Sequence, residues 1–157
     1  MDANKTLIVY ETKGGATEEA ARKIADILRS KYLLEVDLVD LREQKVPNPS
    51  QYKNIVVGSG VRVGKVYKKA LKFLENDLSE KNVAFSVSSS WAGTPGSYDN
   101  AKTKFVENTL AKYSKINPIN TEAFGGRIRY LRKTMVDNTD LAKVEAWAEQ
   151  LGKQFTQ

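Results

Sequence analysis

Glycine-rich loops follow four of the apolar stretches in this sequence, and each loop also contains side chains that can bind a phosphate or a flat ring. The first loop consists of Thr12, Lys13, Gly14, Gly15, Ala16 and Thr17. Its adjacent glycines let the backbone approach a ligand closely, while Thr12 and Thr17 supply hydroxyl donors. A helical pattern begins directly afterwards, so unpaired amides at a helix start would point at the same place. The loop therefore predicts a phosphate cradle, with a plain strand-to-helix turn capped by Thr17 as the alternative.

The second loop, from Gly58 to Lys65, reads Gly-x-Gly-x-x-x-Gly. This spacing is not the dinucleotide fingerprint, and the loop follows the third strand-like stretch instead of the first. Its three glycines indicate a backbone that lies close to a ligand or adopts positive φ. Arg62 either pairs with a phosphate or a ring carbonyl, or lies in solvent. The candidate residues of this loop are Gly60, Val61, Arg62, Val63 and Gly64.

The third loop places an aromatic ring among small polar residues. Trp91 lies within residues 88–98, where no helical or strand pattern would bury it. An aromatic side chain on such a loop is a candidate for stacking on a planar ligand, and the alternative is that it folds back onto the core. The candidate residues here are Ser89, Ser90, Trp91, Ala92, Gly93 and Tyr98. The fourth loop, residues 125–130, adds glycines and arginines, of which Arg127 is the candidate ligand.

The composition excludes several kinds of chemistry. The chain of 157 residues has no Cys and no His, which removes disulfides, thiolate nucleophiles, Cys-ligated clusters and the usual proton-transfer side chain near neutral pH. No acidic cluster with metal-ligand spacing is visible either. Redox or group-transfer chemistry would therefore come largely from a bound organic cofactor. The net charge of +6 indicates an acidic ligand or partner.

The elements that must position these loops alternate between strand-like and helix-like stretches. Strand-like stretches cover residues 6–10, 34–39, 55–58, 83–87 and 119–124, and helical patterns cover residues 20–32, 66–78, 101–113 and 141–155. Strands alternating with helices are typical of right-handed βαβ units and of a parallel sheet with helices on both faces. We therefore expect an α/β, doubly wound fold, a single domain over residues 1–157, and all four loops at the carboxyl edge of the sheet.

The first loop resembles the phosphate loop of the flavodoxin family, Ser/Thr-x-Thr-Gly-x-Thr, although Gly14 stands where that pattern usually has Thr. The resemblance spans essentially the whole chain and is closest to the branch that includes the flavodoxin-type protoporphyrinogen dehydrogenases. That branch shares an Arg-x-Gly, here Arg62 to Gly64, and a Gly-x-x-Arg-Tyr, here Gly126 to Tyr130. The resemblance implies a flavodoxin-like three-layer sandwich with a five-stranded parallel sheet in order 2-1-3-4-5, and it implies FMN as the cofactor.

Carried over to this sequence, the resemblance assigns a part of FMN to each loop. Residues 12–17 would bind the FMN phosphate. Residues 60–64 and 89–93 would lie along the two sides of the isoalloxazine ring, with Trp91 as the stacking partner. A peptide of the second loop, between Val61 and Gly64, would hydrogen-bond a ring nitrogen.

The resemblance implies a soluble carrier that moves electrons between redox partners through FMN, without a catalytic side chain of its own. A positive rim that includes Arg62 would raise the flavin potential. The alternative is an FMN-dependent oxidoreductase of a small molecule, of the protoporphyrinogen IX dehydrogenase or quinone reductase type, with Tyr98 and Tyr130 lining its pocket. The dehydrogenases carry a long basic and apolar segment after the Arg-Tyr motif, whereas residues 131–137 are short here.

The positive charge favours an acidic redox protein, such as a ferredoxin or a reductase, as the partner. Basic stretches at residues 65–72 and 127–133 also suit a nucleic-acid-binding domain, but a solvated surface explains them better, and we expect no nucleic acid. The apolar strand at residues 6–10 is too short for a signal peptide, and no stretch is long enough to span a membrane. We therefore expect a cytoplasmic protein without stable membrane insertion. Response-regulator receivers and low-molecular-weight phosphatases are set aside, because their acidic residues and loop cysteine are missing.

Overall fold

The computed structural model describes residues 2–157, with side chains from Asn4 onward. Its main sheet consists of parallel strands in the order β2-β1-β3-β5-β6, and the short strand β4 pairs antiparallel with the end of β3. The parallel strands are β1 (Asp2–Glu11), β2 (Glu35–Asp40), β3 (Tyr52–Arg62), β5 (Asn82–Ser88) and β6 (Pro118–Phe124), and β4 is Lys65–Val66. Counting only the parallel strands, the order is 2-1-3-4-5, as predicted.

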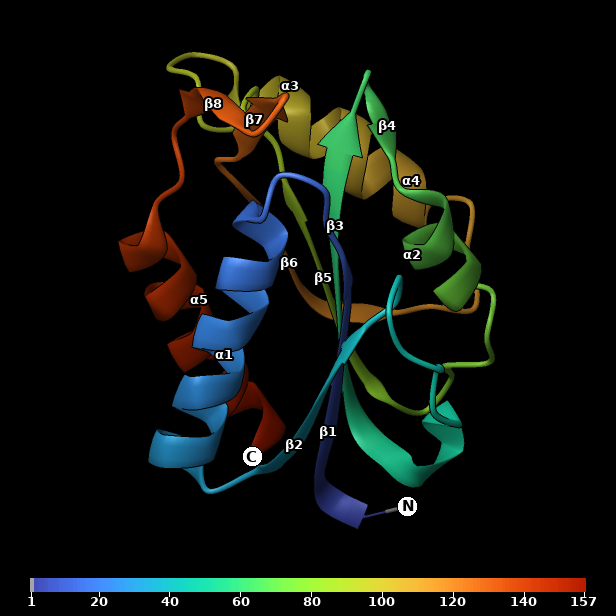
Figure 1. Cartoon of the computed structure of the whole chain (residues 1–157). Coiled ribbons are helices and arrows are strands. Elements are labelled where there is room, and N and C mark those ends of the chain that lie inside the picture. Colours follow the sequence, from blue (N-terminus) through green and yellow to red (C-terminus); the bar gives the residue numbers. More distant parts are fainter. Residues whose placement is uncertain (1) are drawn as a thin grey trace.

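Helices cover both faces of this sheet, which gives three layers (Figure 1). Helices α1 (Ala16–Tyr32) and α5 (Leu141–Phe155) lie on one face, where Ile24, Leu28 and Trp147 are fully buried. On the other face lie α2 (Lys68–Phe73) and a continuous helical stretch made of α3 (Tyr98–Lys102), the π-helical turn η2 (Thr103–Glu107) and α4 (Asn108–Leu110). The central strands are apolar toward both layers because neither face meets water.

The helix after the second loop is shorter than its apolar pattern predicts. The pattern covers residues 66–78, but Val66 belongs to β4, and the helix ends at Phe73. The side-chain amide of Asn76 donates to the Phe73 carbonyl at 2.8 Å, which satisfies the helix end. Leu74 and Leu78 lie beyond the helix but are still buried. The apolar spacing therefore predicts which residues are buried, but not where the helix ends.

Two β-hairpins project from the carboxyl edge of the sheet, and the sequence pattern predicted neither. The first joins β3 to β4 through a two-residue turn, Val63-Gly64. The second pairs β7 (Arg127–Tyr130) with β8 (Lys133–Asp137) through another two-residue turn, Leu131-Arg132. Figure 1 shows both at the end of the molecule where β3 ends, opposite the N-terminus.

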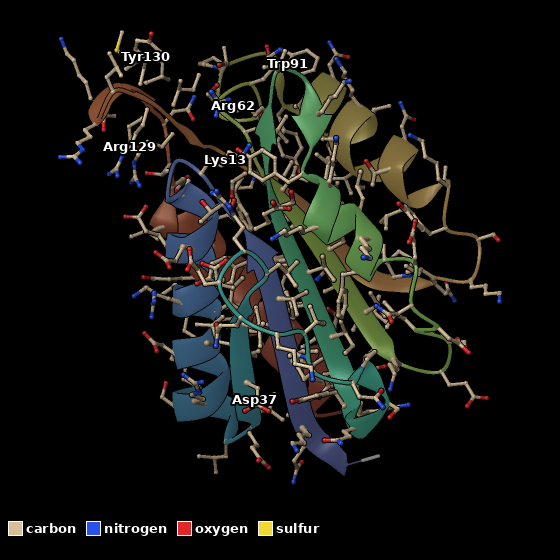
Figure 2. All side chains as sticks on the ribbon, turned by 45° about the vertical axis from the view of Figure 1, so that its right-hand side comes forward. Lys13, Asp37, Arg62, Trp91, Arg129 and Tyr130 are labelled. Atoms are coloured by element: carbon tan, nitrogen blue, oxygen red, sulfur yellow. The ribbon has the colours of Figure 1, made fainter. Side chains whose placement is uncertain are left out.

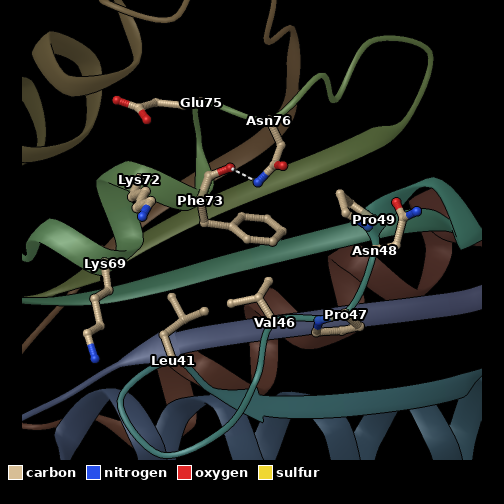
Figure 3. A pocket seen from close by; sticks show the side chains of 10 residues that line it. All are labelled: Leu41, Val46, Pro47, Asn48, Pro49, Lys69, Lys72, Phe73, Glu75 and Asn76. Atoms are coloured by element: carbon tan, nitrogen blue, oxygen red, sulfur yellow. Dashed lines mark hydrogen bonds between the residues drawn. The ribbon is translucent and has the colours of Figure 1, made fainter.

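The crossover from β2 to β3 contains no α-helix, only turns and the 3₁₀ helix η1 (Pro49–Gln51). Without a helix here, the sheet face beside α2 is covered less completely, and a hollow of about 660 Å³ remains (Figure 3). Leu41 and Phe73 form its buried apolar floor, and Lys69 and Lys72 lie at one end. No helix in the described part of the chain is long and apolar enough to cross a membrane.

Candidate functional site

The first loop connects β1 directly to α1 and exposes the start of that helix at the carboxyl edge. Gly15 is the N-cap residue and has φ +91°, a conformation that favours glycine. The hydroxyl oxygen of Thr12 accepts a hydrogen bond from the Gly15 amide at 3.0 Å, which holds the loop closed. The Thr12 hydroxyl keeps its own proton for donation. A helix of this length leaves its first amides, from Ala16 onward, without intrahelical partners, and these donors suit a phosphate group.

Two glutamates in the first turn of α1 oppose this use, because their negative charges repel an anion at the helix start. Glu18 accepts a hydrogen bond from the Tyr10 hydroxyl and pairs with Arg22 at 3.5 Å. Glu19 pairs with Arg127 at 2.6 Å, which largely neutralises it. A phosphate at this helix start would therefore need cations that come from elsewhere in the chain.

Arg127 lies at the start of β7 and joins the hairpin to the first loop. Its side chain is only 10% exposed, it binds Asp137 at 3.0 Å, and it donates to the Gly14 carbonyl at 3.4 Å. Burial lowers the pKa of Arg127, but its hydrogen bonds to Asp137 and Glu19 raise that pKa above its usual value. A Cβ atom at Gly14 would collide with the Arg127 carbonyl oxygen, so glycine is required where these two segments meet.

A pocket of about 580 Å³ opens next to this loop, between the two hairpins and the third loop. Its lining comes from four segments, and the residues are Val61, Arg62, Val63, Gly64, Ser88, Ser89, Ser90, Trp91, Lys104, Phe105, Arg127 and Ile128. We call it the ring pocket. A volume of this size is typical of small-ligand sites, and its place outside the strand ends beside the β1/β3 switch point is where doubly wound proteins bind ligands. Figure 2 shows Arg62, Trp91 and Lys13 gathered at this end, opposite Asp37.

One wall of the ring pocket is aromatic and positively charged. Trp91 is 38% exposed and packs edge-on against Phe105, with ring centroids 5.7 Å apart. The Lys104 ammonium lies 5.8 Å from the Trp91 centroid and 5.5 Å from that of Phe105. Trp91 therefore neither folds into the core nor stands free in solvent, and one part of it remains open to the pocket.

The other predicted residues lie near the ring pocket without lining it. A Cβ at Gly60 would approach the Tyr67 ring at 2.8 Å, and one at Gly93 would collide with Asn138. Ala92 is buried in the core. Tyr98 donates a hydrogen bond to Glu122 on β6 and faces a separate, smaller hollow. The structure thus brings residues 61–64, 89–91 and 127 together, with residues 12–17 alongside through Arg127.

Three groups that support the site escaped the sequence pattern. Lys104 and Phe105 reach the ring pocket from η2, and a π-helical turn has no spacing signal of its own. The Asn138 side chain donates to the Ser90 carbonyl at 2.7 Å and accepts from the Gly126 amide at 2.9 Å, which ties the second hairpin to the third loop. Glu11, buried at the end of β1, accepts from the Lys69 amide at 2.9 Å.

The hollow in Figure 3 is larger than the ring pocket, but no glycine lines it. It lies beside the β2–β3 crossover, and it shares no lining residue with the ring pocket. No glycine-rich loop reaches it. We therefore place the candidate site at the carboxyl edge.

Comparison with known proteins gives one family and many similar folds. The family model described as the flavodoxin domain matches residues 7–153. Oxidised flavodoxin 2 from Bacillus cereus is 22% identical, with 96% of this chain and 99% of that chain covered and a TM-score of 0.68. A short-chain flavodoxin associated with a non-canonical PDU bacterial microcompartment is 16% identical, with 96% and 98% covered and a TM-score of 0.65.

The same fold also occurs as part of a longer protein. Rubredoxin:oxygen oxidoreductase from Desulfovibrio gigas is 17% identical with a TM-score of 0.60, and the match covers 97% of this chain and 36% of that one. At these identities the likeness shows the fold alone. A search of curated proteins gave no match.

Proposed function

The chain belongs to the flavodoxin family, and we propose that it binds FMN at the carboxyl edge of its sheet and carries electrons between redox proteins. The observation that carries this proposal is the pairing of two unlike subsites. A phosphate-type cradle at the start of α1 adjoins a ring-sized pocket, and Arg127 belongs to both.

The donor set fits FMN. The amides at the start of α1 and the Thr12 hydroxyl suit its phosphate, and the cations Arg62 and Lys104 offset its negative charge, while Arg127 neutralises Glu19 beside the phosphate position. Trp91 offers part of an aromatic face, and residues 61–64 offer backbone groups from the opposite hairpin. Bound FMN would supply the reversible electron storage that side chains lack, while the protein positions it and limits its contact with water.

Absorbance and fluorescence titrations test the proposal. FMN added to the purified protein is expected to bind with one-to-one stoichiometry and lose its fluorescence. Riboflavin, which lacks the phosphate, is expected to bind more weakly by about tenfold or more, because the cradle holds the phosphate. A protein that binds neither flavin would disprove the proposal, and equal affinity for both would disprove the cradle at the start of α1.

The proposed partner is an acidic redox protein such as a ferredoxin or a reductase, since the chain carries a net charge of +6. The proposal treats residues 1–157 as one functional domain in the cytoplasm. Fractionation of cells that produce the protein at native levels tests that location.

A second candidate is oxidation of a small flat molecule, as in the dehydrogenase branch that the sequence resembles. It is favoured by one observation, namely that Ile128 and Trp91 make part of the ring-pocket rim apolar and accessible, at 47% and 38% exposure. Steady-state assays with protoporphyrinogen IX and a menaquinone analogue distinguish the two functions. A carrier accepts electrons from ferredoxin but turns over neither small molecule.

A further inference from the structure

The tips of the two hairpins expose large apolar side chains on either side of the ring pocket. Val63, in the turn of the β3–β4 hairpin, is 90% exposed, and Leu131, in the turn of the β7–β8 hairpin, is 82% exposed. The second hairpin also exposes Tyr130 and Met135, at 66% and 59%. Figure 2 shows Tyr130 pointing away from the body of the molecule. Exposed apolar side chains that gather in one place mark an interaction surface.

Both turns use residues that are poorly suited to their backbone. A two-residue hairpin turn with positive φ at both positions favours Asn-Gly. Here Val63 has φ +51° before Gly64, and Leu131 and Arg132 have φ +49° and +65°. A β-branched or bulky residue in this conformation is an outlier. Neither apolar side chain gains burial in return, so folding alone does not explain either one.

Basic side chains surround these tips. Exposed cations at or beside the tips are Arg62, Lys65, Arg129, Arg132 and Lys133. None of them forms an ion pair with a carboxylate elsewhere in the described residues, whereas Arg127 deeper in the site forms two. An apolar centre with a polar rim is the usual anatomy of a protein–protein interface, and the positive rim selects an acidic partner.

We propose that the two hairpin tips, Val63 and Leu131, are apolar anchors of one docking surface for an acidic redox protein with an apolar depression beside its redox group. The inference rests on the proposed function, because the surface encloses the ring pocket and would bring the partner over its mouth. The basic rim accelerates encounter, and the apolar tips slow dissociation.

Replacement of Leu131 by Asn tests the surface, and the chain provides a matched control. Leu33 is also 82% exposed and also has positive φ, +54°, but it ends α1 at the opposite edge of the sheet. Asn tolerates this backbone conformation, so both variants should fold. Electron transfer from a reduced acidic iron–sulfur ferredoxin to the FMN-loaded protein is measured by stopped-flow absorbance at increasing ferredoxin concentration. We expect Leu131→Asn to raise the half-saturating concentration by about tenfold, and Leu33→Asn to leave it unchanged.

Three outcomes would overturn the docking surface. The first is an equal response of the two variants. The second is Leu131-dependent binding to phosphatidylglycerol vesicles together with unchanged ferredoxin kinetics, since the hairpin would then serve a membrane. The third is a Leu131-dependent dimer in sedimentation, since the tip would then contact a second copy. FMN binding is measured separately on the wild type and on each variant, which keeps the two proposals apart. A wild type that does not bind FMN refutes the proposed function but not the docking surface.

Binding of ferredoxin can also be measured without flavin. Calorimetric binding of ferredoxin to FMN-free protein, with and without Leu131→Asn, reports docking alone. A tenfold loss in the variant supports the surface even if FMN were not the cofactor. The absence of a measurable difference, with wild-type binding intact, contradicts it.

Discussion

At the scale of single residues, Arg127 is the group on which both halves of the site depend. It neutralises Glu19 at the start of α1, contacts the Gly14 carbonyl and lines the ring pocket. Removal of its charge would leave the first-turn glutamate unpaired beside the phosphate cradle. We expect Arg127→Gln to raise the Kd for FMN by about tenfold, which corresponds to roughly 1.4 kcal/mol, as measured by flavin fluorescence quenching.

Arg22 provides the control for this prediction, because it pairs with the other first-turn glutamate, Glu18, from an exposed position. Arg22→Gln should change the Kd by less than about twofold, as expected for a surface ion pair. Arg127→Lys should restore only part of the affinity. A lysine ammonium lacks the planar, forked donors with which the guanidinium binds Glu19, Asp137 and the Gly14 carbonyl at the same time. Similar losses in Arg22→Gln and Arg127→Gln would mean that net charge matters and the geometry of Arg127 does not.

Asp137 makes the stability of the β7–β8 hairpin sensitive to acid. Hydrogen bonds from Thr139, together with Arg127, lower the pKa of Asp137 from 3.8 to about 2. Because the folded-state pKa is lowered, this stabilisation is fully present above the unfolded value and is lost as pH falls through the folded value. Asp137→Asn should therefore lower Tm at pH 6, and the difference from wild type should be mostly lost near pH 2. A difference of the same size at both pH values would show that the carboxylate charge plays no part.

If FMN binds in the ring pocket as proposed, Lys104 lies where its charge would influence the flavin potential. Its ammonium lies against Trp91 and Phe105 in the ring pocket, where a positive charge stabilises the anionic reduced form. A change of about 1 kcal/mol in this stabilisation corresponds to roughly 40 mV for one electron. We expect Lys104→Gln to lower the midpoint potential by about this amount, and Arg62→Glu to lower it as well. Lys102→Gln, two residues away on α3 and beside Tyr98, serves as the control. Potentiometry that finds equal potentials in Lys104→Gln and wild type would rule Lys104 out.

At the scale of secondary-structure elements, the two strained turns give a stability prediction that is independent of any ligand. The left-handed conformation costs an ordinary side chain roughly 1 kcal/mol or more, and Asn reduces that cost. Relief of 1 kcal/mol in a domain of this size raises Tm by about 2–4 °C. We therefore expect Leu131→Asn and Val63→Asn each to raise Tm by about that amount in thermal unfolding followed by circular dichroism.

Leu131→Ala separates the two explanations for such a rise. Alanine keeps the Cβ atom that makes the left-handed conformation unfavourable, so this variant should show no increase in Tm. An increase with Ala equal to that with Asn would mean that the exposed apolar surface, and not the backbone, lowers stability. A rise in stability combined with weaker ferredoxin docking would show that the tips are kept for interaction.

The elements with strong periodicity were predictable from the sequence, and the elements around the site were only partly so. The buried strands and α1 and α5 follow apolar spacing, so their order and the carboxyl edge follow from simple crossover rules. The β7–β8 hairpin lacks that signal because almost all of its side chains are exposed. Its strands therefore show no alternation of buried and exposed residues that a sequence pattern could reveal. Likewise, residues 58–65 were expected as a loop because glycines obscure a strand that continues to Arg62.

The positions of side chains in the site were likewise only partly predictable from the sequence. Residues 12–17, 61–64 and 89–91 were predicted to share one edge because they follow parallel strands, and they do. The involvement of Lys104 required the π-helical turn, and the buried position of Arg127 required its two carboxylate partners. Neither a π turn nor a long-range ion pair has a spacing signature in a single sequence. Whether the predicted residues bind FMN stays a prediction for the titrations above.

At the scale of the whole molecule, the positive charge should make reaction with an acidic partner sensitive to salt. The chain has a net charge of +6, and among the described residues the exposed hairpin cations Arg62, Lys65, Arg129, Arg132 and Lys133 form no ion pair and lie at the proposed docking surface. Screening lengths fall to about 10 Å at 0.1 M salt, so the rate of electron transfer from ferredoxin should fall steeply as ionic strength rises. Reduction by a neutral deazaflavin radical should not respond to salt.

Two double variants distinguish a local patch from net charge alone. Arg129→Glu with Arg132→Glu reverses the hairpin charge, and Lys112→Glu with Lys115→Glu lowers the net charge equally from exposed positions between α4 and β6. If steering acts through the docking surface, the hairpin variant should lose most of its rate at low salt and show a flat salt dependence. The Lys112→Glu, Lys115→Glu variant should keep most of its rate at low salt and most of its salt dependence, because its altered charges lie away from the proposed docking surface. Equal losses in the two variants would place the attraction in the charge of the whole molecule, and the hairpins would then contribute only their apolar tips.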